Sequence, residues 1–293
     1  MEKRAKAVIR VLVISLSATL VAAGLKIYYG RASHSLAFVA DGIHSLFDAA
    51  ATLIGILSIT LSSKPPDEGH PYGHQKLESV STIALGLMLL SAAYEVGTMA
   101  IERMGHGEMP HYSFWGFLVL GIVMIINLTV ARFETNRAHD LSSQFLAADA
   151  LHNQSDFLIS CAVLASLLAV YFHIPYVDAG ASLAITVYLV YLSLRLIWLN
   201  LRPLVDSRVL DPAKVEEIVG STEGVMFCHN IRSRGEHGHH FLDLNIHLPG
   251  HITLHRAHEI THQVEAKLKA AFPGLVDVVI HTEPHDHPPC SKG

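Results

Sequence analysis

The chain has 293 residues, of which 51% are hydrophobic and 16% are charged, and its formal net charge is −5. A soluble domain typically has about 25% charged residues, so this composition indicates a membrane protein, and the negative charge argues against a nucleic-acid partner. The 21 histidines equal the lysines and arginines in number, which favours metal or proton handling. Neither a disulfide framework nor a thiolate zinc site is expected from Cys161, Cys228 and Cys290, which form no C-x-x-C pair.

Six apolar stretches are each long enough to cross a membrane, which takes about 20 helical residues. They comprise residues 7–29, 35–62, 76–103, 113–133, 142–172 and 176–201. Lysines and arginines gather before the first stretch, in the loops after the second and fourth, and after the sixth, whereas the opposite side has mainly Arg31 and Arg103. Because cytoplasmic loops carry an excess of Lys and Arg, both termini are expected on the cytoplasmic side of the inner membrane.

The second and fifth stretches share the pattern D-x-x-H-x-x-x-D, which begins at Asp41 and at Asp149. Residues i, i+3 and i+7 of a helix lie on one face, and ionisable groups inside a membrane usually mark an ion or proton path. The i,i+4 pairs offer two imidazoles and two carboxylates, an N₂O₂ set that suits tetrahedral Zn²⁺. The predicted transport site is therefore His44, Asp48, His152 and Asp156.

An alternative for these four side chains is a hydrogen-bond network that only ties two helices together. Asp41 and Asp149 each precede a histidine by nearly one turn and are not expected to be ligands. As supporting groups they would orient the imidazoles, place charge along the path or cap the helices.

The loop between the second and third stretches is rich in proline and glycine and holds Asp67, His70 and His74. Their spacing allows one metal ion to contact all three, and the prolines and glycines restrict the loop's conformations. The pattern predicts a second metal site at the cytoplasmic side. A polar turn that binds no metal is the alternative.

After Pro203 the long apolar stretches end and shorter elements begin. The expected elements are a helix at 211–219, strands at 225–234 and 241–248 with a turn at 235–238, a helix at 254–272 and a strand at 276–281. This α-β-β-α-β order indicates a small α+β domain. The expected organisation is a six-helix transmembrane domain over 1–208, a cytoplasmic domain over 209–284 and a flexible tail over 285–293.

Several residues of this small domain have metal-ligand chemistry and lie on different predicted elements, so they can converge, although their spacing does not show that they do. They are His229, His247, His258, His281 and Glu283. Two weaker groups could bind metal adventitiously. They are the turn residues Glu236, His237, His239 and His240, and the tail residues His285, Asp286, His287 and Cys290.

The segment from His258 to His262 matches H-E-x-x-H, the signature of zinc proteases. A protease also needs a third ligand and a substrate cleft, and this helix has Ile260, Val264 and Leu268 as a core-facing stripe within a small domain. A membrane zinc hydrolase is therefore the weaker alternative. A metal sensor that does not transport is another, which only a flux measurement excludes.

The motifs together resemble those of the cation diffusion facilitator family over nearly the whole chain. The second stretch has A-D-x-x-H-x-x-x-D, the loop has P-x-D-x-x-H-P-Y-G-H-x-K-x-E, and the fifth stretch has H-x-x-S-D. The small domain has H-x-I-R-S-R, A-H-x-I-x-x-x-V-E and I-H-x-E-P. Members of the family often have Asp where His44 stands, and histidine in both pairs favours zinc.

The resemblance implies a homodimeric antiporter, not an enzyme, that lies in membrane lipid and exports Zn²⁺ from the cytoplasm in exchange for H⁺. Cd²⁺, Co²⁺, Fe²⁺ and Mn²⁺ are the other ions it allows. It implies that the three predicted residue sets are a transport site, a loop site and a site in a metallochaperone-like domain that dimerises. It also implies a charge contact between Lys76 and Asp206 near the dimer interface.

Overall fold

The computed structural model describes residues 2–105, 114–171, 177–236 and 238–285. Contacts divide the chain into two compact units, Met1–Leu201 and Arg202–Gly293.

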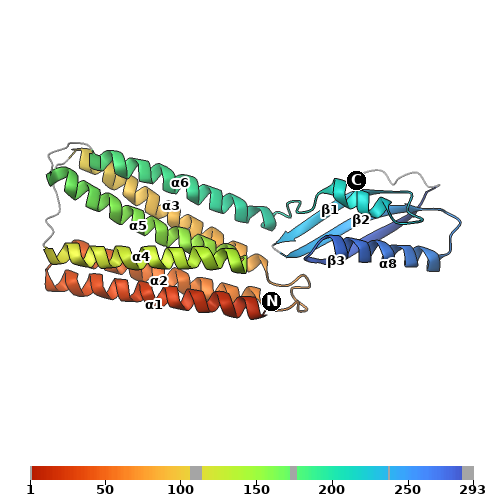
Figure 1. The fold of residues 1–293 in the computed structure, drawn as a ribbon, viewed down its shortest axis with the longest axis horizontal. Coiled ribbons are helices and arrows are strands. Elements are labelled where there is room, and N and C mark those ends of the chain that lie inside the picture. Colours follow the sequence, from red (N-terminus) through yellow and green to blue (C-terminus); the bar gives the residue numbers. More distant parts are fainter. Residues whose placement is uncertain (1, 106–113, 172–176, 237, 286–293) are drawn as a thin grey trace. The chain divides into compact units, whose positions relative to one another are not determined.

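The first unit is built from six long helices that run side by side (Figure 1). They are α1 (Glu2–Ala32), α2 (Leu36–Ser62), α3 (Lys76–Gly105), α4 (Phe114–Leu141), α5 (Gln144–Tyr171) and α6 (Val177–Leu204). Over their described residues, α1, α2, α3, α4 and α6 are long and apolar enough to cross a membrane. The remaining helix, α5, carries the second D-x-x-H-x-x-x-D pattern. The six predicted stretches are thus observed as six helices.

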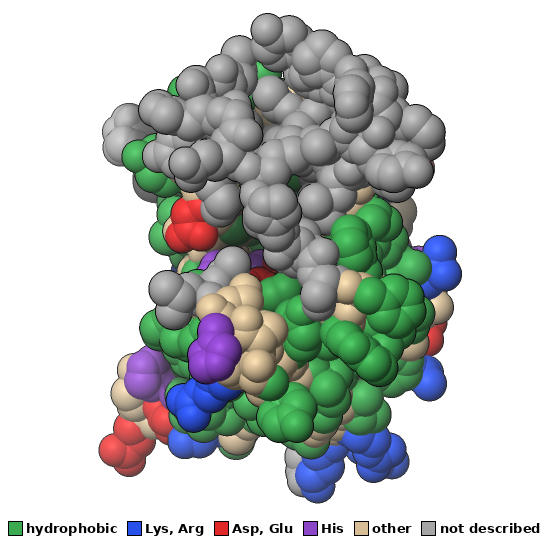
Figure 2. Space-filling view, turned by 90° about the vertical axis from the view of Figure 1, so that its left-hand side faces the viewer, with side chains coloured by type: hydrophobic (Ala, Val, Ile, Leu, Met, Phe, Trp, Pro, Cys, Tyr) green, Lys and Arg blue, Asp and Glu red, His purple; other side chains and the backbone are tan. Residues whose placement is uncertain are grey.

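Large apolar side chains on the outside of this unit are exposed, as a lipid environment requires. Phe47 and Ile54 of α2, Ile125 of α4 and Trp198 of α6 are each at least 60% exposed. Hydrophobic side chains likewise cover much of the described surface in a space-filling view (Figure 2).

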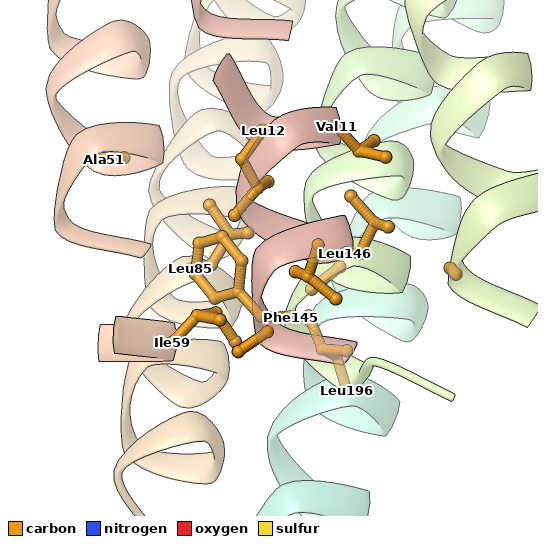
Figure 3. Close-up of a cluster of buried hydrophobic side chains, with 12 residues drawn as sticks. Val11, Leu12, Ala51, Ile59, Leu85, Phe145, Leu146 and Leu196 are labelled. Carbon is orange, nitrogen blue, oxygen red and sulfur yellow. The ribbon is translucent and has the colours of Figure 1, made fainter. Parts of the chain in front are cut away.

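The interior of the bundle is packed around Phe145, near the start of α5, which is 1% exposed. Its ring lies among side chains of other helices in the cluster of Figure 3, which includes Leu12, Ile59, Leu85 and Leu196. A methyl group on Gly55 of α2 would overlap this ring. The glycine therefore lets α2 approach α5 closely, and these two helices carry the predicted transport site.

Arg4 of α1 joins three segments at one end of the bundle. Its guanidinium donates to the Leu141 carbonyl oxygen at 2.7 Å and to the Ser142 carbonyl oxygen at 2.8 Å, and its Nη1 lies 3.2 Å from Oε2 of Glu78. The Ser143 hydroxyl donates to Oε1 of Glu78 at 2.7 Å. The start of α1, the start of α3 and the turn between α4 and α5 therefore share one end.

The second unit is a three-stranded sheet with two helices, in the predicted α-β-β-α-β order (Figure 1). Its elements are α7 (Pro212–Gly220), β1 (Phe227–Glu236), β2 (His239–Leu248), α8 (Leu254–Ala271) and β3 (Leu275–Pro284). The strand order is β1-β2-β3, with β1 antiparallel and β3 parallel to β2. Both helices contribute to one core with alternate residues of β2, from Leu242 to Leu248. Alternation leaves the other residues of β2 for the opposite face.

The strand bounds differ from the predicted ones, because β1 begins and ends two residues later, and β2 and β3 are longer. β1 and β2 reach Glu236 and His239, so the turn is shorter than the expected 235–238, and β3 continues to Pro284. Pairing between strands supplies hydrogen bonds that a local pattern does not reveal. The extension of β3 matters because it places Glu283 directly opposite His247. His285 donates its backbone N–H to the Leu248 carbonyl oxygen at 2.8 Å, and the rest of the tail lies outside the described residues.

Candidate metal centres

The first candidate centre lies between α2 and α5, where Asp48, His152 and Asp156 bring one ligand atom each to within 4.8 Å of one another. His152 Nε2 is 3.0 Å from Asp48 Oδ1, although the two residues are 104 positions apart. Asp48 and His152 are only 6% and 4% exposed. His152 Nδ1 has no hydrogen-bond partner among the described residues. A buried imidazole between two carboxylates is the donor set of a divalent metal site.

His44, the fourth predicted ligand, lies beside this group rather than within it. Its Nε2 is 3.9 Å from Asp48 Oδ1, and its side chain is 45% exposed. One turn of α2 separates the two residues, so the imidazole can reach the same carboxylate, but in this conformation it stands at the rim.

The two supporting aspartates have different surroundings. Asp41 pairs with Lys26 of α1, whose ammonium lies 3.0 Å from Asp41 Oδ1 and also donates to the Ser45 hydroxyl. Asp149 is 2% exposed and accepts a hydrogen bond from Thr52 of α2 at 3.4 Å. Because His152 Nδ1 is unbonded among the described residues, Asp149 does not orient that ring here.

The second candidate centre is in the loop after α2, where Asp67, His70 and His74 converge. Asp67 Oδ1 lies 3.2 Å from His70 Nδ1, and its Oδ2 lies 3.3 Å from His74 Nε2. The backbone N–H of His70 donates to Asp67 Oδ1 at 2.7 Å and keeps the pKa of this carboxyl below its usual value. Asp67 is therefore ionised at neutral pH and available to a cation.

The third candidate centre lies on the face of the sheet opposite the helices. One cross-strand row there consists of Phe227, His247 and Glu283, and the next row contains His229, opposite Asn245. His247 Nε2 lies 3.0 Å from His229 Nε2 and 3.1 Å from Glu283 Oε2, and the three ligand atoms form one group. His247 is 1% exposed and stacks on the Phe227 ring at 4.0 Å.

Partial burial opposes ionisation of Glu283, but other groups outweigh it. The Asn245 amide donates to Glu283 Oε1 at 2.6 Å, and three histidines surround the carboxyl. They hold the pKa of Glu283 below its usual value. His281 Nε2 lies 3.6 Å from Glu283 Oε1, but its side chain is 66% exposed, so it stands at the edge of the group.

His258 does not reach this group within one chain. It precedes Ile260, a core residue of α8, by two positions, or about 200° around the helix, so its side chain is exposed on the outer side. Its Nε2 lies 3.1 Å from His262 Nε2. Glu259, the acidic residue of the H-E-x-x-H match, is paired with Arg256 at 2.8 Å. The three residues of this match therefore lie on an exposed surface of α8.

The remaining predicted positions belong to the turn group, the tail group and the predicted charge contact. Glu236 and His239 face each other at the end of the β1–β2 pair, and His237 and the tail residues after His285 lie outside the described residues. Asp206 Oδ2 is 3.9 Å from Arg234 Nη1, and Lys76 opens α3.

Three residues next to these centres were not singled out from the sequence. Lys26 pairs with Asp41, Asn245 supports Glu283, and Glu134 is fully buried beside Asp149. The sequence does contain a signal for Lys26, because a lysine in the middle of an apolar helix needs a polar or charged partner. Glu134 lies just beyond the predicted end of the fourth stretch at 133, and α4 continues to Leu141.

Two family models match successive parts of the chain. Residues 12–205 match the cation efflux transmembrane domain, and residues 210–285 match the cytoplasmic domain of cation efflux proteins. The uncharacterized transporter MJ0449 of Methanocaldococcus jannaschii is 31% identical over 265 residues, which are 88% of this chain and 92% of that protein.

Two further relatives are named for efflux. The cation-efflux pump FieF of Cronobacter sakazakii is 30% identical over 92% of this chain and 91% of its own length. The manganese efflux system protein MneP of Bacillus subtilis is 30% identical over 94% and 96%. With both domains matched in order, the chain belongs to the cation diffusion facilitator family and is a multi-pass membrane protein that acts as a cation efflux transporter, not as an enzyme.

Proposed function

We propose that this transporter exports Zn²⁺ from the cytoplasm in exchange for H⁺, with His44, Asp48, His152 and Asp156 as its transport site. The observation that carries the proposal is the buried contact of 3.0 Å between His152 Nε2 and Asp48 Oδ1, which joins α2 to α5. Two imidazoles and two carboxylates would give zinc the four-coordinate N₂O₂ set that it prefers. His44 would complete this set by turning its ring inward from the rim.

Competition between metal and protons at the same atoms would couple the two fluxes. A hydrogen bond between His152 Nε2 and Asp48 holds a proton, whereas a metal ion needs the imidazole nitrogen and the carboxylate free of protons. Metal entering the site would release protons. Protons arriving from the other side would displace the metal, so exchange needs no separate proton channel.

The shared end of the bundle supports a proposed orientation in the membrane. The start of α1, the α2–α3 loop and the α4–α5 turn are near Arg4, and the sequence places an excess of Lys and Arg there. By the positive-inside rule this end would face the cytoplasm of the inner membrane, with both termini on that side. Asp67, His70 and His74 would then bind metal at the cytoplasmic face.

The cytoplasmic domain would bind metal and hold two copies together. The donor set of His229, His247 and Glu283 supports this proposal, because His247 Nε2 lies within 3.1 Å of a ligand atom of each of the other two residues. As part of this proposal, Lys76 and Asp206 keep their predicted charge contact near the dimer interface, and His258 stays a predicted ligand of the cytoplasmic site.

Mn²⁺ is the second candidate cargo. One relative is named as a manganese efflux protein. If His44 stays at the rim, the group is one imidazole and two carboxylates, and oxygen-rich sets suit Mn²⁺ better than N₂O₂ does. Flux of Zn²⁺ into liposomes under a pH gradient, competed by Mn²⁺, Fe²⁺, Co²⁺ and Cd²⁺ in turn, ranks the ions.

The transport site is tested by Asp48→Asn and Asp156→Asn in the same liposomes. Each change removes a charged ligand but keeps the side chain's shape, so zinc flux is expected to fall at least about tenfold. Asp140→Asn is the matched control, because this carboxylate at the end of α4 is exposed and pairs with Arg137. Normal flux in both site variants would exclude the assignment.

A further inference from the structure

A second polar group lies inside the bundle next to the transport site. Glu134 of α4 and Asp149 of α5 are 0% and 2% exposed, and their carboxyl groups are close enough to share a hydrogen bond. The Asn153 amide donates to Glu134 Oε2 at 2.9 Å, and the Thr52 hydroxyl donates to Asp149 Oδ1 at 3.4 Å. Among the described residues, Glu134 Oε1, Asp149 Oδ2 and the buried Ser15 hydroxyl have no hydrogen-bond partner.

Each helix packed around the pair contributes few charges. On α1 the neighbour is Ser15, on α2 they are Thr52 and Asp48, and on α5 His152 lies one turn after Asp149. His152 is engaged with Asp48 at 3.0 Å. No lysine or arginine among the described residues pairs with either carboxyl. Two adjacent buried carboxylates cannot both stay ionised without such a partner.

We propose that Glu134 and Asp149 bind one proton between them while the transport site is empty, and that metal binding expels this proton. A shared proton would satisfy both orphaned oxygens in one hydrogen bond, as in other adjacent carboxyl pairs. A divalent cation at Asp48, His152 and Asp156 adds two positive charges about one turn away and favours the ionised pair. The pair is then a binding site for the counter-ion, separate from the metal ligands. It rests on the proposed exchange of metal for H⁺.

The test counts protons released per Zn²⁺ bound to the full chain in detergent, by calorimetry in buffers of different ionisation enthalpy. Glu134→Gln keeps the oxygen that accepts from Asn153 but cannot share a proton as an acid. The release is expected to fall by about one proton per metal ion, and the slope of log Kd against pH by the same amount. Asp149→Asn should do the same.

Glu78→Gln is the matched control, because Glu78 is also buried but pairs with Arg4 and Ser143. Its proton count should equal that of the unchanged protein. Infrared difference spectra give a second readout. Adding Zn²⁺ to the unchanged protein should remove a carbonyl band of a protonated carboxylic acid, and Glu134→Gln should lack this change.

An unchanged proton count in both Glu134→Gln and Asp149→Asn, or no carboxylic-acid band lost when zinc binds, would overturn the proposal. Failure of the proposed function has a different signature. In that case the unchanged protein shows no pH-driven zinc flux in liposomes, whatever the proton count in detergent.

Discussion

His247 is the most enclosed residue of the cytoplasmic group, whereas His281 of the same predicted set is mostly exposed. His247→Ala removes a ligand and the ring that stacks on Phe227. The zinc bound per chain at low free Zn²⁺ is therefore expected to fall by about one ion, as measured by equilibrium dialysis. His281→Ala should leave the number of bound ions unchanged. Equal losses in the two variants would mean that the exposed histidine is an equal ligand.

The lowered pKa of Glu283 determines how acid affects the same site. A carboxyl whose pKa is lowered by folding stabilises the native state above its unfolded pKa of about 4.3 and loses this contribution as the pH falls through the folded value. Glu283 therefore stays ionised between pH 7 and 5.5.

Glu283→Gln is accordingly expected to weaken zinc binding at every pH in this window without changing the slope of log Kd against pH. Calorimetric titrations at several pH values measure both the affinity and the slope. A slope that changes in Glu283→Gln would show that this carboxyl titrates within the window.

At the scale of helices, the approach of α2 to α5 depends on Gly55, where a methyl group would overlap the Phe145 ring. Gly55→Ala is expected to destabilise the bundle by about 1–3 kcal/mol, as overpacking does. It should also lower zinc flux, because α2 and α5 hold Asp48 and His152. Gly24→Ala on α1 is the control, since a methyl group there meets no atom within 4 Å.

The stability of the two glycine variants is measured by thermal unfolding in detergent, and their zinc flux is measured in liposomes. Gly24→Ala should be neutral or slightly stabilising, because alanine favours a helix by up to about 1 kcal/mol. If Gly55→Ala behaved like Gly24→Ala, the close approach of the two helices would not matter for transport.

Strand β2 contributes to the hydrophobic core on one face and to the metal group on the other. In β2, Leu244 and Ile246 face the helices and build the core, while Asn245 and His247 face the other way and build the metal group. A shift of one residue in register would exchange the two sets. The hydrophobic core therefore also fixes the position of the metal ligands.

At the scale of the whole molecule, dimer formation should depend on metal in the cytoplasmic domain. A ligand that binds the dimer more tightly than the monomer stabilises the dimer. Analytical ultracentrifugation of the full chain in detergent is expected to show more dimer with Zn²⁺ than with a chelator. The difference should disappear in His247→Ala. A monomer fraction that is the same with and without zinc would contradict the link between metal and assembly.

Much of this molecule could be predicted because the signals are local. Six helices, the α-β-β-α-β order and the spacing of His152 and Asp156 depend on apolar stretches and helical periodicity, which a single segment contains. The bounds of the strands could not be predicted as well, because β2 and β3 extend beyond the predicted residues only where a partner strand provides hydrogen bonds.

The sequence by itself determined that this is a membrane protein with two similar histidine and aspartate faces and a small α+β domain. Only the tertiary structure decided that Asp48 meets His152 while His44 stands at the rim, that α8 carries His258 away from His247 and Glu283, and that Glu134 lies beside Asp149. The physical reason is that spacing along a helix fixes which residues share a face. The direction in which that face points, and its distance from the ligand-bearing face of another element, depend on packing between elements far apart in the chain.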